Sequence, residues 1–355
     1  MYGFARALDR RINERHEQIN VTAFASGDSD LPFPIVSNHP VATTLDPSIA
    51  DQKSVERALI REAFSRADDF DLYHVHISNG ESVLPLIQDM NKPVLFTLHG
   101  GVDQAYEPSL FSSFKDLKNI HFVSISDAQR VRLPDLPYTQ TIHHGIDPLI
   151  YPFDTSGGNR IVWVGRGVVE KGLGDALSVL EFTSYSLGVA VVLKDQWKEW
   201  YEKSIEPRVA QLTDRVTVSK NLDRALLPAF FSDAKLFLFP VGWEEPFGLV
   251  TIESMAVGTP VVAYARGALP EIIKDGKTGF LVNPSESDMR GDFVIKKTGV
   301  EGLREAVERI YELSDEDYKT MRWACRQHIE EKFTLETMVD SYIELYKKLT
   351  ENPNI

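Results

Sequence analysis

The sequence predicts an α/β protein made of two tandem doubly wound domains, each built on a parallel sheet. Its 355 residues are enough for two domains that each bury a core of their own. Short runs rich in β-branched and aromatic residues alternate with longer segments of helical period, which is the pattern of βαβ units. Residues 145–158 are rich in Pro and Gly and have no period, so we place the boundary between the two domains there.

The first domain is expected over residues 1–150. It opens with a helical segment, and its first clear strand is expected at residues 21–25. Further strands are expected at residues 71–77, 93–98, 120–125 and 138–142. The segments between them are long enough for the helical crossovers that parallel strands require.

The second domain is expected over residues 151–330. Its strands are expected at residues 160–165, 188–193, 215–218, 234–239, 260–264 and 279–282, and each is followed by a plausible helix. Residues 331–355 form a last helix headed by Thr334. Apolar residues make one stripe along that helix, which we expect to pack back on the first domain: Leu335, Met338, Val339, Tyr342, Leu345 and Leu349.

Composition and charge exclude several classes of function. The net charge of −14 has the wrong sign for a protein that binds a phosphate backbone, and it also disfavours an anionic membrane surface. The only cysteine, Cys325, excludes an intramolecular disulfide and a cysteine-based metal site. No run approaches the ~20 apolar residues that span a bilayer. We therefore expect a cytoplasmic protein that binds small molecules; its oligomeric state does not follow from the sequence.

The most informative stretch is residues 240–262, which reads as a strand, a short loop, a helix and another strand. Pro246 suits the first position of the helix, and Gly248 leaves a bare backbone beside it. Unpaired amides at such a helix start attract anions, phosphates above all. We expect a phosphate group to bind here.

Two acidic residues of this stretch, Glu245 and Glu253, are separated by seven residues. At the helical rise they are roughly 12 Å apart, too far to share one bond-breaking event. That spacing suits carboxylates that hold separate hydroxyl-bearing parts of one long ligand. The alternative is an acidic residue favoured by the helix dipole together with a solvated glutamate.

A second motif, residues 164–172, follows the first strand of the second domain. It fails as a dinucleotide fingerprint because Glu170 occupies the position of the third glycine, so a nicotinamide enzyme is the weaker interpretation. Arg166 and Lys171 instead bring two cations to the carboxyl end of a strand, where open α/β sheets bind their ligands. Arginine grips a phosphate bidentately and lysine neutralises another as a point charge. The alternative is a pair of solvated surface cations.

These stretches, together with residues 265–282, resemble glycosyltransferase family 4, a group of enzymes with the GT-B fold. The Glu-x7-Glu and Gly-Arg-x4-Lys-Gly signatures occur in the order and spacing of that family, as do the strands Gly-Thr-Pro-Val-Val and Asp-Gly-x-Thr-Gly-Phe-Leu-Val. The sequence of residues 243–249 is most similar to that of the branch of UDP-glucose:tetrahydrobiopterin glucosyltransferases. The resemblance implies two Rossmann-like domains that face a cleft, with the donor bound by the second domain and the acceptor by the first.

The resemblance also implies a reaction and a set of roles. Family members transfer a hexose from an NDP-sugar, here a UDP-sugar such as UDP-glucose, to a hydroxyl acceptor with retention of configuration, without a metal or another cofactor. Four residues are expected to serve catalysis: His99 contacts the donor sugar, Arg166 and Lys171 neutralise its diphosphate, and Glu245 holds its hydroxyls. The donor site is completed by Glu253 on the ribose diol and by the backbone amides of Phe247, Gly248 and Leu249.

The sequence departs from the family at its beginning and leaves alternatives open. Family members start with a strand and a Gly-rich turn, whereas this sequence starts at the helix that follows them. We expect a shortened form whose turnover would rise with about 15 to 20 more residues upstream. A sugar-nucleotide epimerase or phosphorylase on the same fold is one alternative, and an impaired nucleotide-sugar-binding protein is another. His74 and His76 share a strand face, so a metal site there is a further alternative.

Overall fold

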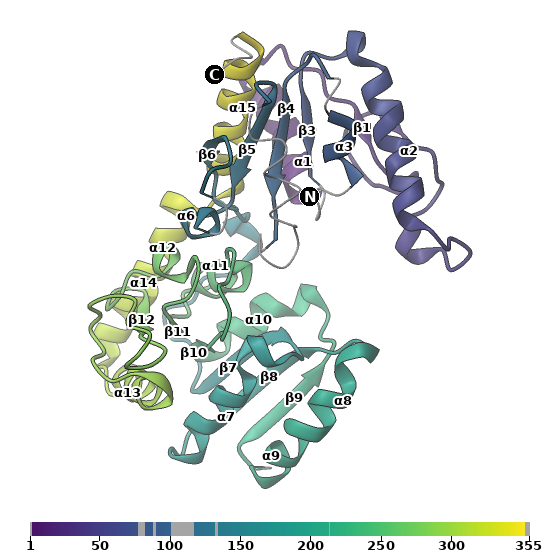
Figure 1. Cartoon of the computed structure of the whole chain (residues 1–355). Coiled ribbons are helices and arrows are strands. Elements are labelled where there is room, and N and C mark those ends of the chain that lie inside the picture. The colour runs from purple at the N-terminus through teal and green to yellow at the C-terminus, as the bar shows by residue number, and fades with distance from the viewer. Residues whose placement is uncertain are drawn as a thin grey trace. The chain divides into compact units, whose positions relative to one another are not determined.

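The chain folds into two compact units in the computed structural model, which describes residues 2–76, 82–87, 90–100, 117–131, 134–212 and 214–351 (Figure 1). The first unit comprises Met1–Gly145 together with Leu335–Ile355, and the second comprises Ile146–Thr334. Every pairing between named strands of the described residues is parallel. The predicted class, α/β with two Rossmann-like domains, is confirmed.

The first unit holds a four-stranded sheet of order β3-β4-β5-β6 and a separate parallel pair, β1-β2. Its strands are β1 (Ala23–Phe24), β2 (Ile35–Val36), β3 (Tyr73–Val75), β4 (Val94–Leu98), β5 (Ile120–Ser124) and β6 (Tyr138–Thr141). Its helices are α1 (Tyr2–Arg15), α2 (Gln52–Ser65), α3 (Leu84–Ile87), α6 (Asp127–Arg130) and α15 (Leu335–Glu351), with short 3₁₀ turns at Thr43–Leu45 and Ala67–Asp69. Within the part of the chain that is described, β3 pairs with β4 alone and β1 with β2 alone.

Alternation along β4 explains how this sheet is covered on both faces. Phe96 faces the core that contains α2 and α3, whereas its neighbour Leu95 faces the core formed by α1 and α15. Successive strand residues point to opposite faces, so a strand buried on both sides needs apolar residues at consecutive positions. The apolar stripe of α15 packs in this second core, which places the last helix with the first unit (Figure 1).

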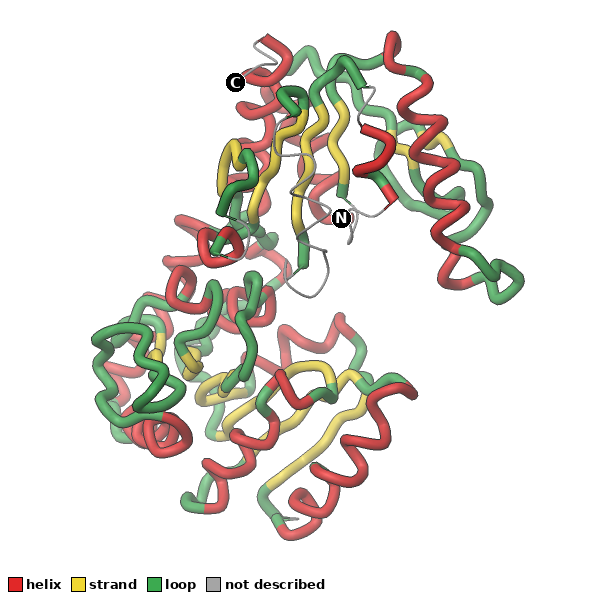
Figure 2. The backbone as a smooth tube through the Cα atoms, in the orientation of Figure 1, coloured by secondary structure: helices red, strands yellow, loops and turns green. Residues whose placement is uncertain are grey.

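The second unit has one six-stranded sheet of order β12-β11-β10-β7-β8-β9, flanked by helices (Figure 2). Its strands are β7 (Arg160–Arg166), β8 (Leu187–Val192), β9 (Val216–Lys220), β10 (Ala234–Phe239), β11 (Val261–Tyr264) and β12 (Gly279–Val282). Its α-helices are α7 (Leu173–Glu181), α8 (Asp195–Ser204), α9 (Glu206–Gln211), α10 (Leu227–Ser232), α11 (Leu249–Ala256), α12 (Leu269–Ile272), α13 (Gly299–Tyr311) and α14 (Asp315–Lys332). Short 3₁₀ turns lie at Pro148–Ile150, Val169–Lys171 and Arg224–Leu226.

The strand order of the second unit decides where a ligand can bind. β7, the first strand of the unit, lies beside β10, and the chain leaves both strands at the same edge of the sheet. In open parallel sheets such a switch in strand order creates a crevice at the carboxyl ends of the strands. The two motifs identified in the sequence follow β7 and β10. Among the described helices, none is both long and apolar enough to cross a bilayer.

Candidate functional site

The loops that follow β7 and β10 are joined to each other by their backbones. The amide of Gly242 donates a hydrogen bond to the carbonyl of Glu170 over 2.8 Å. Gly172 has φ +72°, and a Cβ there would lie 1.8 Å from the carbonyl oxygen of Pro240, so this approach requires glycine. The buried indole of Trp163 donates to the carbonyl of Lys171 over 3.0 Å. These contacts hold the two motifs side by side.

Lys171 and Glu245, which the sequence places 74 positions apart, form a buried ion pair. Lys171 Nζ lies 2.6 Å from Glu245 Oε2, and the two side chains are 11% and 9% exposed. Trp243 Nε1 donates to the same oxygen over 2.8 Å. Glu245 Oε1 has no hydrogen-bond partner within the described ranges, and it remains as an acceptor for a ligand hydroxyl.

Arg166 supplies a second cation next to this pair. Its guanidinium lies 5.6 Å from the ring centres of both Trp197 and Trp243, and Lys171 Nζ lies 4.8 Å from the Trp243 ring. Indole faces attract cations, so the two rings position the guanidinium without neutralising it. Arg166 is exposed and makes no ion pair with any residue that the structure describes. The loop end of β7 therefore offers a positive charge to an anion from solvent.

The start of α11 differs from the prediction. Gly248 adopts φ +93° and caps the helix, which begins at Leu249, so Pro246 lies in the preceding loop and not at the first helical position. A left-handed residue cannot continue the helix toward its N-terminus. Glu245 is therefore outside the helix, and the separation of about 12 Å from Glu253, which assumed a continuous helical rise, does not apply. In the first turn of α11, Thr251 donates its amide to the carbonyl of Gly248 over 2.9 Å, whereas the amides of Leu249 and Val250 precede the first i→i−4 bond of the helix.

Glu253 is buried in the middle of α11, and only 2% of its side chain is exposed. Arg224 Nη2 donates to Glu253 Oε1 over 2.7 Å, although 76% of the Arg224 side chain is exposed. Tyr151 also hydrogen-bonds Glu253, and burial together with this carboxylate raises the pKa of the tyrosine well above its ordinary value. A ligand that reaches Glu253 must displace Arg224, the exposed one of these two partners.

The loop after β11 holds the Glu244–Glu245 segment in place. The amide of Ala268 donates to the carbonyl of Glu245 over 2.9 Å, and the amide of Gly267 donates to Glu244 Oε2 over 2.7 Å. Burial opposes ionisation of Glu244, but the Gly267 amide and the Arg290 guanidinium lower its pKa. Gly267 has φ +56°, and a Cβ there would lie 2.1 Å from the Glu245 carbonyl oxygen.

His99 follows β4 in the first unit, and the structure surrounds it with other histidines. Its Nε2 lies 3.0 Å from His76 Nδ1, and its ring stacks on that of His144 at 5.4 Å between centres. Burial lowers the pKa of His99 to about 4, so the ring is neutral near pH 7. Across the described ranges, no three His, Cys, Asp or Glu side chains are grouped to hold a metal ion, these histidines included.

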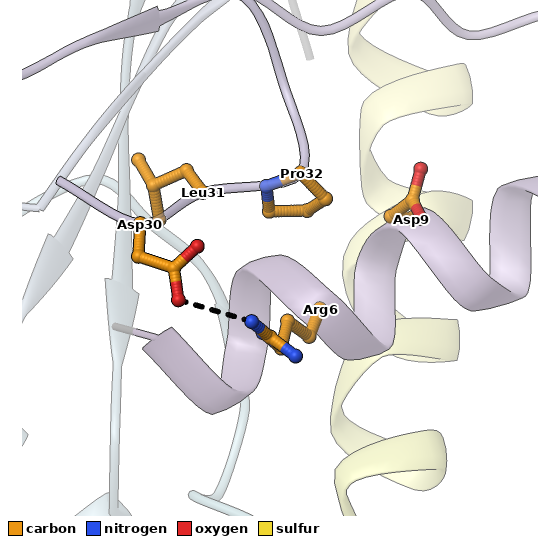
Figure 3. Close-up of a pocket in the computed structure, with 5 residues that line it drawn as sticks. All are labelled: Arg6, Asp9, Asp30, Leu31 and Pro32. Carbon is orange, nitrogen blue, oxygen red and sulfur yellow. Dashed lines mark hydrogen bonds and ion pairs between the residues drawn. The ribbon is translucent and has the colours of Figure 1, made fainter.

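Two surface cavities lie away from the predicted residues. One, of about 390 Å³, is lined by Arg6, Asp9, Asp30, Leu31 and Pro32, and its Arg6 guanidinium is 3.1 Å from Asp30 (Figure 3). The other, of about 240 Å³, lies against Lys274, Thr278 and His328. Neither contains a residue of the two motifs.

Four side chains that the sequence analysis did not name contact the candidate site residues or the loop that carries them: Trp197, Trp243, Glu244 and Arg224. Trp243 and Glu244 lie within the motif of residues 240–262 and directly precede Glu245, so their position in the sequence could have indicated them. Arg224 is 29 positions from Glu253, and nothing in the local sequence marks it. Only the fold brings such residues together.

The fold is GT-B, the two-domain architecture of the glycosyltransferases that the chain resembles in structure. Solved structures show the likeness along almost the whole chain. A sucrose-phosphate synthase from Thermosynechococcus elongatus superimposes with a TM-score of 0.74 over 98% of this chain and 92% of its own, at 21% identity. Anabaena HepE in complex with UDP and glucose superimposes with a TM-score of 0.71 over 98% of this chain and 96% of its own, at 16% identity.

Within that class, residues 154–296 match the family model of the glycosyl transferases group 1. Phosphatidyl-myo-inositol mannosyltransferase of Mycobacterium leprae is 25% identical over 83% of this chain and 82% of its own length. An uncharacterized 41.2 kDa protein in the cps region of Klebsiella pneumoniae is 31% identical over 53% of this chain, and the match spans 46% of that protein. Family model and relatives together support a group 1 glycosyltransferase, and the matched region contains both sequence motifs.

Proposed function

We propose that this chain is a retaining glycosyltransferase that moves a hexose from an NDP-sugar, a UDP-sugar such as UDP-glucose, to a hydroxyl acceptor. The observation that carries the proposal is the exposed Arg166, which has no acidic partner among the described residues and shares the Trp243 ring with Lys171. Two cations at the carboxyl end of one parallel strand, Arg166 at the end of β7 and Lys171 in the turn after it, suit a ligand with two phosphates.

The proposed chemistry needs these cations. When the bond between the sugar and the diphosphate breaks, negative charge grows on the leaving group, and a fixed cation stabilises that charge more in the transition state than in the bound donor. Trp197 and Trp243 hold Arg166 before the donor arrives. Little reorganisation is then required at the moment of bond breaking.

Two carboxylates are proposed to hold the ends of the donor. Glu245 Oε1 accepts a hydrogen bond from a sugar hydroxyl, while Oε2 stays with Lys171 and Trp243. Glu253 accepts the ribose diol after Arg224 has moved aside. His99 contacts the sugar, and the amides of Gly248 and Leu249 face the phosphates and the sugar. The proposal includes no metal and no cofactor other than the donor.

Several comparisons support a UDP-sugar as donor. Structures of HepE with UDP and with UDP-glucose share the fold along 98% of this chain. The proposed acceptor is a hydroxyl compound of the tetrahydrobiopterin class, because residues 243–249 resemble the tetrahydrobiopterin glucosyltransferase branch. A cytoplasmic location remains part of the same proposal, and the single cysteine of the chain is consistent with it.

Nucleotide binding tests the donor site directly. UDP, GDP and ADP are titrated calorimetrically into the wild-type chain, into Arg166→Met and into the control Arg309→Met, whose arginine pairs with Glu305 on the surface of α13. Loss of one charge-assisted contact should weaken UDP binding about tenfold in Arg166→Met and leave the control unchanged. Failure of every nucleotide to bind, or equal UDP affinity in both variants, overturns the proposed site.

Product stereochemistry tests the reaction. UDP-glucose is incubated with the chain and a panel of hydroxyl acceptors that includes tetrahydrobiopterin, and the anomeric proton of the product is observed by NMR. An α-linked product from this α-configured donor supports retention, and a β-linked product refutes it. Donor isomerised without any acceptor supports an epimerase instead. Binding of UDP-glucose without transfer to any acceptor favours a nucleotide-sugar-binding protein.

A further inference from the structure

A continuous line of hydrogen bonds runs through the first unit and ends at His99. The Tyr346 hydroxyl of α15 lies 2.6 Å from His74 Nδ1. His76 Nε2 lies 3.1 Å from the same nitrogen of His74, and His76 Nδ1 lies 3.0 Å from His99 Nε2. On the other side of its ring, His74 Nε2 lies 2.8 Å from Thr97 Oγ1. Three imidazoles, from His74 on β3, His76 directly after β3 and His99 directly after β4, are therefore connected to one buried tyrosine.

The tyrosine decides the direction of the line. Tyr346 is buried, and His74 Nδ1 is its hydroxyl's only hydrogen-bond partner among the described residues. If His74 donated from Nδ1, the Tyr346 hydroxyl hydrogen would have no acceptor, which is costly in a buried position. Tyr346 therefore donates, and His74 Nδ1 is an acceptor. In a neutral ring the hydrogen of His74 is then on Nε2, from which it donates to Thr97.

The direction carries over from one ring to the next. His76 Nε2 lies 3.1 Å from His74 Nδ1, whose single lone pair already accepts from Tyr346. A bare His76 Nε2 would set two lone pairs against each other, so it carries the hydrogen, shares that acceptor and leaves His76 Nδ1 bare. His99 Nε2 faces that bare nitrogen, so it carries the hydrogen of His99. The remaining nitrogen of His99, Nδ1, is left with a lone pair. This arrangement of hydrogens leaves no two lone pairs facing each other along the line.

Burial keeps the rings neutral, as this arrangement requires. Desolvation lowers the pKa of both His74 and His76 well below the ordinary value, and it lowers the pKa of His99 to about 4. The ring of Phe4 packs against His74 at 6.0 Å and against His76 at 5.3 Å between centres. The phenyl ring covers part of the line and offers no competing hydrogen bond.

We propose that Tyr346, His74 and His76 are positioning residues that fix His99 in its Nε2–H tautomer, so that His99 Nδ1 accepts a hydrogen bond from a hydroxyl of the donor sugar. The tautomers follow from the hydrogen bonds alone, whereas the sugar contact rests on the proposed function. The His74-x-His76 pattern at the end of β3 thereby has a role other than metal binding. The pattern also makes His99 selective for a sugar hydroxyl. The unprotonated Nδ1 accepts a hydrogen bond from that hydroxyl, whereas a donor sugar without the hydroxyl would leave Nδ1 unpaired.

Long-range ¹H–¹⁵N spectra of the ¹⁵N-histidine-labelled full chain, recorded without substrate near pH 7.5, test the tautomers. His74, His76 and His99 are each expected in the Nε2–H form, assigned by single substitutions. In Tyr346→Phe the direction of the line is no longer specified, and the His99 nitrogen shifts are expected to move toward the average of the two tautomers. The control Phe4→Leu removes packing but no hydrogen bond, and it should leave them unchanged. An Nδ1–H form of His99 in the wild type, or unchanged His99 shifts in Tyr346→Phe, overturns the proposal.

Sugar and nucleotide binding are then compared in two variants of His76. His76→Phe has no acceptor for His99, and it is expected to lower the affinity for UDP-glucose about tenfold while the affinity for UDP is unchanged. His76→Asn places an amide oxygen near the position of Nδ1 and should restore most of the loss. An equal loss of both affinities, or none, refutes the contact between His99 and the sugar. Absence of UDP-glucose binding in the wild type would defeat the proposed function and leave the spectral result standing.

Discussion

Replacing Lys171 by methionine tests the buried ion pair that links the two motifs. The ammonium and the carboxylate are 2.6 Å apart and about nine-tenths buried, so Lys171→Met leaves Glu245 charged and without its main partner. Removing one member of a fully buried pair costs about 3 to 5 kcal/mol. Trp243 still donates to Glu245 Oε2 over 2.8 Å, so we expect the lower end, about 3 kcal/mol. For a unit of this size that lowers Tm by roughly 6 to 12 °C.

The chain contains an exposed lysine–glutamate pair at the same distance, which serves as the control, and its tryptophans report the unfolding of the second unit. Lys203 and Glu199 on α8 are also 2.6 Å apart, but their side chains are 72% and 79% exposed, so Lys203→Met should cost less than about 0.5 kcal/mol. All five tryptophans lie in the second unit, so tryptophan fluorescence during thermal or urea unfolding reports on that unit alone. The two units need not unfold together, which makes a local reporter necessary.

The double variant Lys171→Met/Glu245→Gln separates burial of a lone charge from loss of packing. With both charges removed, the cost should fall to within about 1 kcal/mol of the wild type, because no uncompensated charge remains in the interior. If Lys171→Met is no more destabilising than Lys203→Met, the ion pair between Lys171 and Glu245 is not a buried one. A double variant as unstable as Lys171→Met would mean that packing, not charge, explains the loss.

Three further outcomes are expected. Gly267→Ala, at φ +56°, forces a Cβ against the Glu245 carbonyl oxygen. The substitution should weaken UDP-glucose binding at least tenfold, measured by calorimetry, and should destabilise the second unit by about 2 kcal/mol, measured by tryptophan fluorescence. Arg322 is fully buried and donates to backbone carbonyls from Asp154 and Val257, so Arg322→Met should lower the free energy of unfolding by about 3 kcal/mol; a loss below 1 kcal/mol would contradict this count of hydrogen bonds. Burial lowers the pKa of His99 to about 4 and that of His144 to about 3, so the unfolded chain binds more protons below pH 6.5. The first unit should therefore have its full stability above pH 6.5 and lose it as the pH falls toward 4 and then 3. Protection factors of the β4 amides that stay constant across that range, after correction for the intrinsic exchange rate at each pH, would refute the assignment.

Much of the fold followed from local pattern because its strands are buried on both faces. The runs that became β10 and β12 are apolar at consecutive positions, and their bounds match the prediction residue for residue. The start of α11 was predicted three residues early, at Pro246, because a proline favours a first helical turn, whereas the left-handed Gly248 sets the true beginning at Leu249. Helix ends depend on the conformation of single residues, which propensity does not specify.

The sequence by itself determined the α/β class, the parallel strands, and the two motifs with their cations and carboxylates, since these depend on residue type and spacing along the chain. The tertiary structure decided which of them meet. It pairs Lys171 with Glu245 and aims Arg224 at Glu253, and it connects Tyr346 to His99 through two other histidines. These contacts join residues far apart in the sequence, and their geometry depends on strand order and helix packing, which no local pattern encodes.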